Sequence, residues 1–320
     1  MPKALSEQHQ PVMVAEVFEL LKPALLSDDA LLIDCTLGLG GHSEYFLERL
    51  SNLSLIGFDQ DQIALDRAKE RLKEFSNRVI FVKANFKDLK QQLLQLNTHS
   101  VNAIIFDLGI SSIQIDERNR GFSYLSEDEL DMRMDLSSNF TAKQLVNTWD
   151  ENQISKILLE FGEEKFAKKI AKNIIQSRTK APITTTAQLV TLIEKSIPAP
   201  ARRTGGNPAK RTFQALRIAV NQELEVLQVA LIQALELLKP GGRIAVLSYH
   251  SLEDRIVKEV FKSQIIKSKL PRKLPVQESI HQEFNLLTSK PIKPSASEIA
   301  LNARSKSAKL RGIEKLGFAA

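Results

Sequence analysis

Cysteine is almost absent from this 320-residue chain, which contains a single one, Cys35. One cysteine rules out an internal disulfide bond, and this suits a protein of the reducing cytoplasm. The sequence also has no apolar stretch long enough to cross a membrane, and residues 1–7 lack the apolar core of a secretion signal. We therefore expect a cytoplasmic protein that has no membrane among its partners.

Positive charge is concentrated at one end of the chain. The formal net charge is +6, but residues 262–320 contain 12 Lys and Arg against 4 Asp and Glu. This end alone therefore carries +8, and the rest of the chain carries −2. A basic end on a nearly neutral body favours a polyanionic partner. A solvated tail that only aids solubility is the alternative.

Predicted strands and helices alternate in the first third of the chain. Short apolar runs predict buried strands at residues 31–35, 53–58, 79–83 and 101–107, and helical spacing predicts helices at residues 12–22, 43–50 and 62–75. This alternation is typical of crossover connections and a parallel sheet with helices on both faces.

The pattern changes after about residue 114. Residues 153–161, 165–177 and 186–196 show helical periodicity, and residues 197–208 are rich in proline and glycine, as in a loop. No convincing strand occurs there. A long helix is predicted at residues 212–238 and a strand at residues 244–248, which resumes the alternation. We expect an α/β fold: a discontinuous Rossmann-like domain of residues 1–114 and 212–320, interrupted by a helical domain of residues 115–211.

A glycine-rich turn, residues 34–42, lies between the first predicted strand of this sheet and the following helix. Its glycines allow a tight turn and a close approach of a ligand to the helix N-terminus. Asp59 ends the next strand, where a carboxylate can accept hydrogen bonds from both hydroxyls of a ribose. The spacing fits a nicotinamide-dependent oxidoreductase as well as a methyltransferase. Ser43 stands where the dinucleotide motif has its third glycine, and the acid Asp34 at the start is typical of methyltransferases, so we favour S-adenosylmethionine.

Two further strand ends contribute to the same predicted pocket. Phe86 lies just after the third strand, where a side chain can pack on an adenine. Asp107 ends the fourth strand, which faces the same crevice in an open parallel sheet. Asp107 alone could simply cap a turn. Its occurrence together with Asp34, Asp59 and the glycines favours a functional role.

Seven ordered motifs resemble the signatures of one family, the bacterial ribosomal RNA small subunit methyltransferase H. They are residues 9–13, 34–42, 107–112, 133–135, 207–217, 248–254 and 304–311, and together they span nearly the whole chain. The resemblance implies a class I methyltransferase sheet and S-adenosylmethionine as the cofactor. It also implies that the enzyme methylates N4 of a cytidine in the decoding region of 16S rRNA, within the small ribosomal subunit.

The resemblance further implies roles for individual residues, and no metal among them. Gly40, Gly41 and His42 would contact the methionine end of the cofactor, Asp59 its ribose and Phe86 its adenine, while Asp107 and Gln114 would close the pocket. The inserted helical domain would recognise the substrate. The motifs show no departure from the family pattern at these positions.

A cluster of cations supports an RNA substrate. Arg202, Arg203, Lys210, Arg211 and Arg217 surround the glycine-rich segment of the insertion, and with Lys306, Lys309 and Arg311 they could neutralise phosphates while a flipped base enters the crevice. Each of these residues alone is more often a solvated charge. A non-catalytic RNA-binding factor on the same fold is therefore an alternative.

Asp107 is the predicted catalytic residue. Catalysis of methyl transfer consists mainly of holding the acceptor in line with the methyl group. The exocyclic amine of cytosine is a poor nucleophile, so an oxygen that accepts its proton would help, and Asp107, Ser111 and Ser112 are candidates. Many amine methyltransferases have Asn/Asp-Pro-Pro-aromatic after this strand, whereas residues 107–110 read Asp-Leu-Gly-Ile. These residues alone therefore do not identify nitrogen as the acceptor.

Overall fold

The chain divides into two compact units. The computed structural model describes residues 11–109, 120–202, 206–266 and 282–317. Met1–Gly109 and Leu224–Ala320 form one unit, here the sheet unit, and Ile110–Glu223 form the other, the helical unit. The insertion was predicted at residues 115–211, which placed most of the helix that begins at Lys210 in the sheet domain. The structure instead places this helix in the helical unit.

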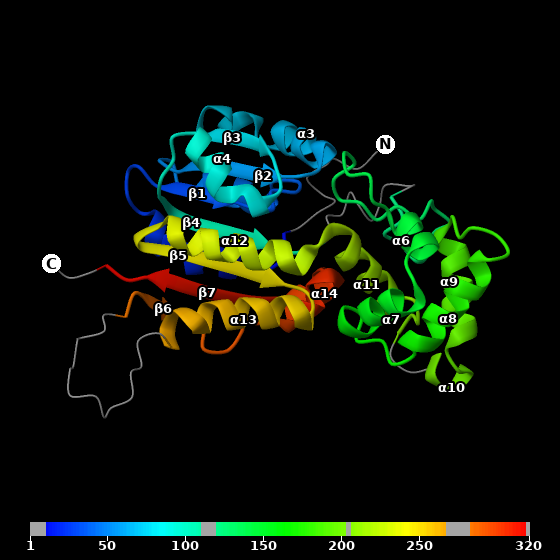
Figure 1. Cartoon of the computed structure of the whole chain (residues 1–320). Coiled ribbons are helices and arrows are strands. Elements are labelled where there is room, and N and C mark those ends of the chain that lie inside the picture. Colours follow the sequence, from blue (N-terminus) through cyan, green and yellow to red (C-terminus); the bar gives the residue numbers. More distant parts are fainter. Residues whose placement is uncertain (1–10, 110–119, 203–205, 267–281, 318–320) are drawn as a thin grey trace, which may run out of the picture. The chain divides into compact units, whose positions relative to one another are not determined.

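A seven-stranded sheet in the order β3-β2-β1-β4-β5-β7-β6 organises the sheet unit (Figure 1). The strands are β1 (Leu31–Asp34), β2 (Ser54–Asp59), β3 (Val79–Lys83), β4 (Val101–Asp107), β5 (Leu238–Ser248), β6 (Phe284–Leu286) and β7 (Lys309–Lys315). The first five run parallel, while β7 pairs antiparallel with both β5 and β6. The strand order reverses between β1 and β4, which is where open α/β sheets bind ligands.

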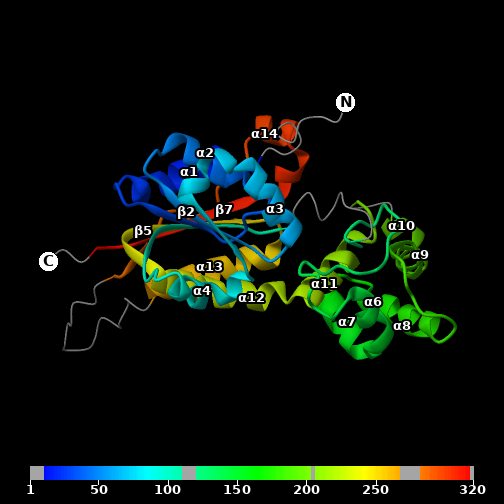
Figure 2. The same ribbon diagram turned by 90° about the horizontal axis from the view of Figure 1, so that it is seen from above.

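Helices cover both faces of this sheet, as Figure 2 shows from above. They are α1 (Val14–Leu21), α2 (Gly41–Arg49), α3 (Gln62–Arg71), α4 (Leu89–Gln95), α12 (Glu223–Leu237), α13 (Ser251–Ile266) and α14 (Ala296–Leu301), with short 3-10 turns at Lys22–Leu25, Lys73–Arg78, Phe86–Asp88 and Ala303–Ser307. Helices α1, α2 and α3 pack on one face, and α4, α12 and α13 pack on the other. Alternate β4 residues, such as Ile104 and Ile105, enter the two different cores. Burial on both faces explains the apolar runs that predicted these strands.

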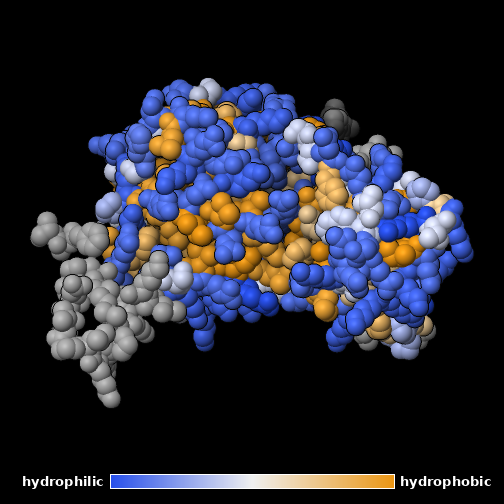
Figure 3. Space-filling model, viewed as in Figure 1, coloured by the Kyte–Doolittle hydropathy of each residue, from blue (hydrophilic) through white to orange (hydrophobic). Residues whose placement is uncertain are grey.

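Apolar side chains also reach the surface of the sheet unit. Figure 3 shows hydrophobic surface over α12, where Val229 and Ile232 are each almost half exposed. Leu94 of α4 is exposed to a similar extent. A folded surface contains much apolar area because polar side chains are too few to cover it. No helix within the described ranges is long and apolar enough to cross a membrane.

The helical unit has its own core. Its helices are α6 (Ala142–Thr148), α7 (Glu151–Glu160), α8 (Ala167–Arg178), α9 (Thr186–Ser196), α10 (Ala199–Arg202) and α11 (Lys210–Asn221). A side chain at the N-cap and a glutamine three residues later form a capping box at the start of α6, α7 and α9. In the part of this unit that the structure describes, the only β pairing is a bridge between Glu129 and Thr185. The prediction of helices without strands is confirmed for that part.

Three predictions need correction. The helix predicted at residues 212–238 is two helices, because Gln222 has a φ of 52° and ends α11. The apolar periodicity continues through this break without a glycine or proline, so the sequence contains no stop signal. Residues 197–208 were predicted as loop, yet they include α10. Strand β5 begins at Leu238, six residues early, and β6 and β7 were not predicted.

Candidate active site

The carboxyl ends of β1, β2 and β4 lie along one edge of the sheet, because these neighbouring strands run parallel. The glycine-rich turn connects β1 to α2 at this edge. Gly40 is the N-cap of α2 and has a φ of 75°, a left-handed conformation that side chains disfavour. A Cβ atom there would also approach the Leu72 side chain to 3.1 Å. The turn therefore needs glycine at position 40.

Asp34 holds this turn through two hydrogen bonds. The Ser43 hydroxyl donates to Asp34 Oδ2 at 2.7 Å, and the Thr36 backbone N–H donates to Oδ1 at 3.1 Å. Burial raises the pKa of Asp34, although the Ser43 hydrogen bond opposes the shift. Ser43 occupies the position of the third glycine in a dinucleotide motif. Its bond to Asp34 gives that departure a physical reason.

Asp59 presents a carboxylate at the end of β2. Its Oδ2 accepts the Gly38 N–H and its Oδ1 accepts the Asp61 N–H, each at 2.9 Å. An ionised carboxylate has about four acceptor sites, so both oxygens retain lone pairs. Burial raises the pKa of Asp59 from 3.8 to about 6. This partly exposed carboxylate fits the two hydroxyls of a ribose.

Phe86 follows β3 at the same edge. Its ring packs edge-to-face on Phe106 of β4, with the ring centroids 5.7 Å apart. Phe106 is buried in the core, whereas Phe86 packs against it and is only partly buried. Its predicted contact with an adenine stays a prediction.

Asp107 lies at the end of β4 between two other polar side chains. The Tyr249 hydroxyl donates to Asp107 Oδ1 at 2.7 Å, and His42 Nδ1 lies 3.6 Å from Oδ2. The Asp107 backbone N–H donates to Thr36 Oγ1 at 2.6 Å, which ties β4 to the glycine-rich turn. Burial raises the pKa of Asp107, while His42 and Tyr249 oppose this increase. The sequence identified Asp107 but assigned Tyr249 no role.

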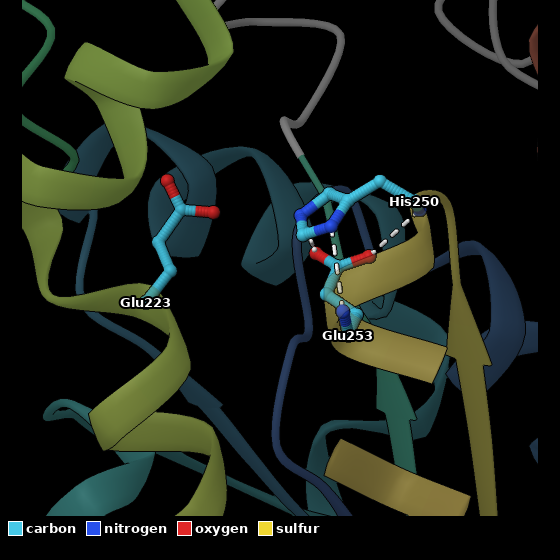
Figure 4. A group of neighbouring side chains, drawn as sticks. All are labelled: Glu223, His250 and Glu253. Atoms are coloured by element: carbon cyan, nitrogen blue, oxygen red, sulfur yellow. Dashed lines mark hydrogen bonds and ion pairs between the residues drawn. The ribbon is translucent and has the colours of Figure 1, made fainter. Parts of the chain in front are cut away.

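The two residues that fix the Tyr249 backbone region, His250 and Glu253, contact each other at the start of α13 (Figure 4). Glu253 Oε2 accepts the backbone N–H groups of Tyr249 and His250, at 2.8 and 3.2 Å, and the Glu253 N–H donates to His250 Nδ1 at 3.3 Å. This reciprocal pattern is a capping box at the start of α13, with histidine in the place of serine or threonine. Glu223, also drawn there, belongs to the helical unit, where it accepts two hydrogen bonds from Arg217.

The structure gives a mixed result for the other predicted site residues. Gly40, Gly41, His42, Asp59, Phe86 and Asp107 all lie at the ends of the parallel strands or in the turn after β1. The His42 ring is buried, with Nε2 3.0 Å from the Val12 carbonyl oxygen. Four of the named residues, Gln114, Arg203, Ser111 and Ser112, lie outside the described residues.

Part of the predicted cation cluster is engaged in ion pairs. Arg217 contacts both carboxylate oxygens of Glu223 at 2.8 Å, so its predicted contact with RNA finds no support. Lys309 and Arg311 both bind Asp254, at 3.1 and 2.6 Å, and join β7 to α13. Both cations therefore already have an acidic partner within the sheet unit, and their contact with RNA stays a prediction. Exposed cations remain in the cluster, namely Arg202 at the end of α10, Lys210 and Arg211 at the start of α11, and Lys306.

Comparison with known proteins covers both units. Residues 6–316 match the model of the MraW methylase family. A ribosomal RNA small subunit methyltransferase H from Mycolicibacterium gilvum (strain PYR-GCK) is 49% identical over 312 residues, which cover 97% of this chain and 84% of the relative. The protein of the same name from Mycolicibacterium smegmatis is 47% identical over 315 residues, with the same two coverages.

Proposed function

Because the chain belongs to the MraW methylase family, we propose that it methylates N4 of a cytidine in the decoding region of 16S rRNA. The ribosomal RNA substrate is supported by the names of relatives that are nearly half identical over almost the whole chain. The N4 atom and the decoding region rest on the resemblance of the seven motifs. The observation that carries the reaction is the Asp107 carboxylate, held at the end of β4 by the Tyr249 hydroxyl.

S-adenosylmethionine is the cofactor, and its sulfonium supplies an activated methyl group. The residues at the sheet edge fit this molecule. Asp59 has free lone pairs for the ribose hydroxyls, and the glycine-rich turn brings backbone N–H groups to the N-terminus of α2. We assign Gly40, Gly41 and His42 to the methionine end, Phe86 to the adenine, and Asp107 and Gln114 to the closure of the pocket.

Asp107 is the proposed catalytic residue. As N4 forms its bond to the methyl carbon, the bond from that carbon to sulfur breaks and positive charge builds on N4. A carboxylate that accepts an N4–H hydrogen bond stabilises this charge and orients the nitrogen lone pair. The amine must then lose one proton, and Asp107 can accept it and release it to water.

The helical unit is the proposed substrate-recognition domain. Arg202, Arg203, Lys210 and Arg211 would bind RNA phosphates, and the exposure of Arg202, Lys210 and Arg211 supports this assignment. An rRNA substrate and a single cysteine, Cys35, also support a cytoplasmic location. A non-catalytic RNA-binding factor would need none of the polar contacts that hold Asp107 and Asp59, which favours the enzyme.

One labelling experiment tests the proposal. The full chain is incubated with labelled S-adenosylmethionine and either undermethylated small subunits or naked 16S rRNA, and the modified nucleotide is mapped by mass spectrometry. We expect one N4-methylated cytidine in the decoding region. A methyl group on C5, on a ribose hydroxyl or on a protein would overturn the proposed reaction. RNA binding without any transfer would support the non-catalytic alternative.

A further inference from the structure

The contact between Tyr249 and Asp107 links the ends of two neighbouring strands. Asp107 is the last residue of β4 and pairs with Leu247 of β5, so Tyr249 lies just beyond the paired region. Its ring packs against Gly109, where a Cβ atom would approach the ring to 3.1 Å. The hydroxyl then reaches back to Asp107 Oδ1. The Tyr249 backbone is fixed as well, because its N–H donates to Glu253.

The Tyr249 hydroxyl is the only side-chain donor within hydrogen-bond distance of the Asp107 carboxylate among the described residues. His42 does not replace it. Nε2 of His42 faces the Val12 carbonyl oxygen, an acceptor, so Nε2 bears the proton. Nδ1 of His42 lies 3.6 Å from Asp107 Oδ2, which is too far for a hydrogen bond. Oδ2 therefore keeps lone pairs for a substrate.

We propose that Tyr249 is a positioning residue for methyl transfer, whose hydroxyl holds the Asp107 carboxylate in the orientation that receives the acceptor amine. A hydrogen bond to a carboxylate also favours its ionised form. The other titratable groups that face Asp107 are His42 on α2, Glu253 on α13 and Asp34 on β1. Burial raises the pKa of Asp107, and removal of the hydroxyl removes one of the two interactions that oppose the increase.

The substitution Tyr249→Phe keeps the ring against Gly109 and removes only the hydroxyl. We expect kcat to fall about tenfold and the acidic limb of its pH profile to move to higher pH by up to about one unit, the scale of one charge-assisted hydrogen bond. The limb moves in this direction because a higher pKa leaves less ionised Asp107 at a given pH. The affinity for S-adenosylmethionine, measured by calorimetry, should change much less.

Two controls separate this role from a structural one. Tyr45→Phe on α2 also removes a phenol hydroxyl, and it should leave the pH profile unchanged. In an Asp107→Asn background, Tyr249→Phe should cause no further loss, because the residue acts through the carboxylate. An unshifted limb, or a full additional loss in that background, would overturn the role of Tyr249. The inference rests on the proposed function, but absence of methyl transfer by the unmodified protein would contradict that function instead.

Positive charge is concentrated in one part of the helical unit. From Lys165 to Arg217 the chain has twelve Lys and Arg residues but a single acidic residue, Glu194. Helix α8 buries Ala167, Ile170, Ala171 and Ile174, and its opposite side carries three exposed lysines, Lys168, Lys169 and Lys172. Lys165, exposed just before the helix, extends this lysine stripe.

The lysine stripe does not stabilise the helix that carries it. Lys168 and Lys169 lie in the first turn, where the helix dipole disfavours positive charge. Lys168 and Lys172 are four residues apart, so their charges repel each other. None of the four lysines forms an ion pair within the described ranges. By contrast, Arg178 at the other end of α8 donates to the carbonyl oxygens of Val146 and Trp149.

We propose that the lysine stripe on α8 is a docking surface for the phosphate backbone of the rRNA substrate. Positive charge that no acid neutralises is complementary to a polyanion, and lysine suits phosphates because it acts as a mobile point charge. The surface would add contacts to those of Arg202, Arg203, Lys210 and Arg211. This inference rests on the proposed function, since it presumes that the polyanion is the substrate.

The test is the salt dependence of 16S rRNA binding by the full chain. Replacing Lys168, Lys169 and Lys172 by Gln removes three cations that would neutralise phosphates, so the slope of log K against log salt should decrease by ~2 to 3. The matched control replaces Arg67, Lys69 and Lys73 of the sheet unit by Gln, which changes the net charge equally. Lys69 and Lys73 already pair with Asp66 and Glu70, so the control should keep the slope.

Equal slopes for the α8 variant and the unmodified protein would overturn this docking surface, and an acidic protein as its partner would give that result. An equal decrease in the control would also overturn it, because net charge rather than the stripe would then be responsible. Failure of the unmodified protein to bind 16S rRNA at all would instead contradict the proposed function. Circular dichroism of both variants checks that α8 and α3 remain folded.

Discussion

The sheet unit and the helical unit use their cations differently. In the sheet unit, cations join elements that are distant in the sequence: Arg71 binds Glu44, Arg243 binds Glu314, and Lys309 and Arg311 bind Asp254. In the helical unit, some pairs exist, such as Arg217 with Glu223 and Arg133 with Asp131. Its exposed lysines on α8, however, have no acidic partner among the described residues.

This difference separates cations that hold the fold from cations that are available to a partner. A count of basic residues treats both groups alike, and it assigned Lys309 and Arg311 to RNA. In the structure both contact Asp254: burial would raise the pKa of Asp254, but hydrogen bonds and charges from Arg311 and Lys309 hold it below its ordinary value of 3.8. The comparison predicts that chemistry and stability depend on the sheet unit and RNA affinity on the helical unit.

The largest effect is expected at Asp107. Asp107→Asn keeps the shape of the side chain and removes its charge, so kcat should fall ~100-fold or more if the charge stabilises the transition state. The affinities for S-adenosylmethionine and for 16S rRNA should change much less. If cofactor binding collapses while turnover at saturation persists, Asp107 is a cofactor ligand only. Equilibrium binding and single-turnover kinetics distinguish the two outcomes.

Asp254 tests the structural half of the comparison. Asp254→Asn removes the partner of two cations in a largely buried position, which should lower the free energy of unfolding by about 2 to 3 kcal/mol. Since the folded-state pKa of Asp254 is lowered, its contribution is complete above 3.8 and is lost as the pH falls through the folded value. Asp66→Asn, which breaks the exposed pair with Lys69, is the control and should cost well under 1 kcal/mol.

Asp59, at the end of β2, is expected to determine the affinity for the cofactor. Asp59→Ala should weaken S-adenosylmethionine binding by roughly 1.5 to 3 kcal/mol, the scale of hydrogen bonds to a charged group. Because burial raises the pKa of Asp59 to about 6, cofactor affinity should also fall as the pH decreases through 6. Calorimetry at several pH values measures both effects. An affinity that is independent of pH would contradict the raised pKa of Asp59, and an unchanged affinity in Asp59→Ala would exclude Asp59 as a ribose ligand.

Much of the sheet could be predicted because its signals are local. The apolar runs of β3 and β4 are continuous, and the structure has both strands at the predicted bounds. Strand β7 was missed because its residues, Lys-Leu-Arg-Gly-Ile-Glu-Lys, are partly charged and lie in a basic segment. It pairs with β5, and Lys309 and Arg311 contact Asp254 of α13, which are tertiary contacts that a local sequence signal does not contain.

Prediction of the candidate site from the sequence is limited in the same way, because local signals do not contain tertiary contacts. Asp59 and Asp107 could be identified because each ends a strand of recognisable sequence. Tyr249 could not, since its role depends on the register of β4 and β5, which places it beside Asp107. One signal existed: residues 248–254 form a family motif that follows a parallel strand. A motif at a strand end of the same sheet edge is therefore a reason to expect a contact with the site.

The smallest expected effect per residue concerns the cations around the glycine-rich segment of the helical unit. Replacing Arg202, Arg203, Lys210 and Arg211 by Ala should flatten the salt dependence of 16S rRNA binding, by less than one unit of slope for each phosphate that is no longer neutralised. Cofactor affinity should stay unchanged, because Asp59 and the glycine-rich turn belong to the sheet unit. Fluorescence anisotropy across a salt series measures the slope. A slope equal to that of the unmodified protein would show that these four residues do not contact phosphates. RNA affinity in the helical unit would then depend on other cations.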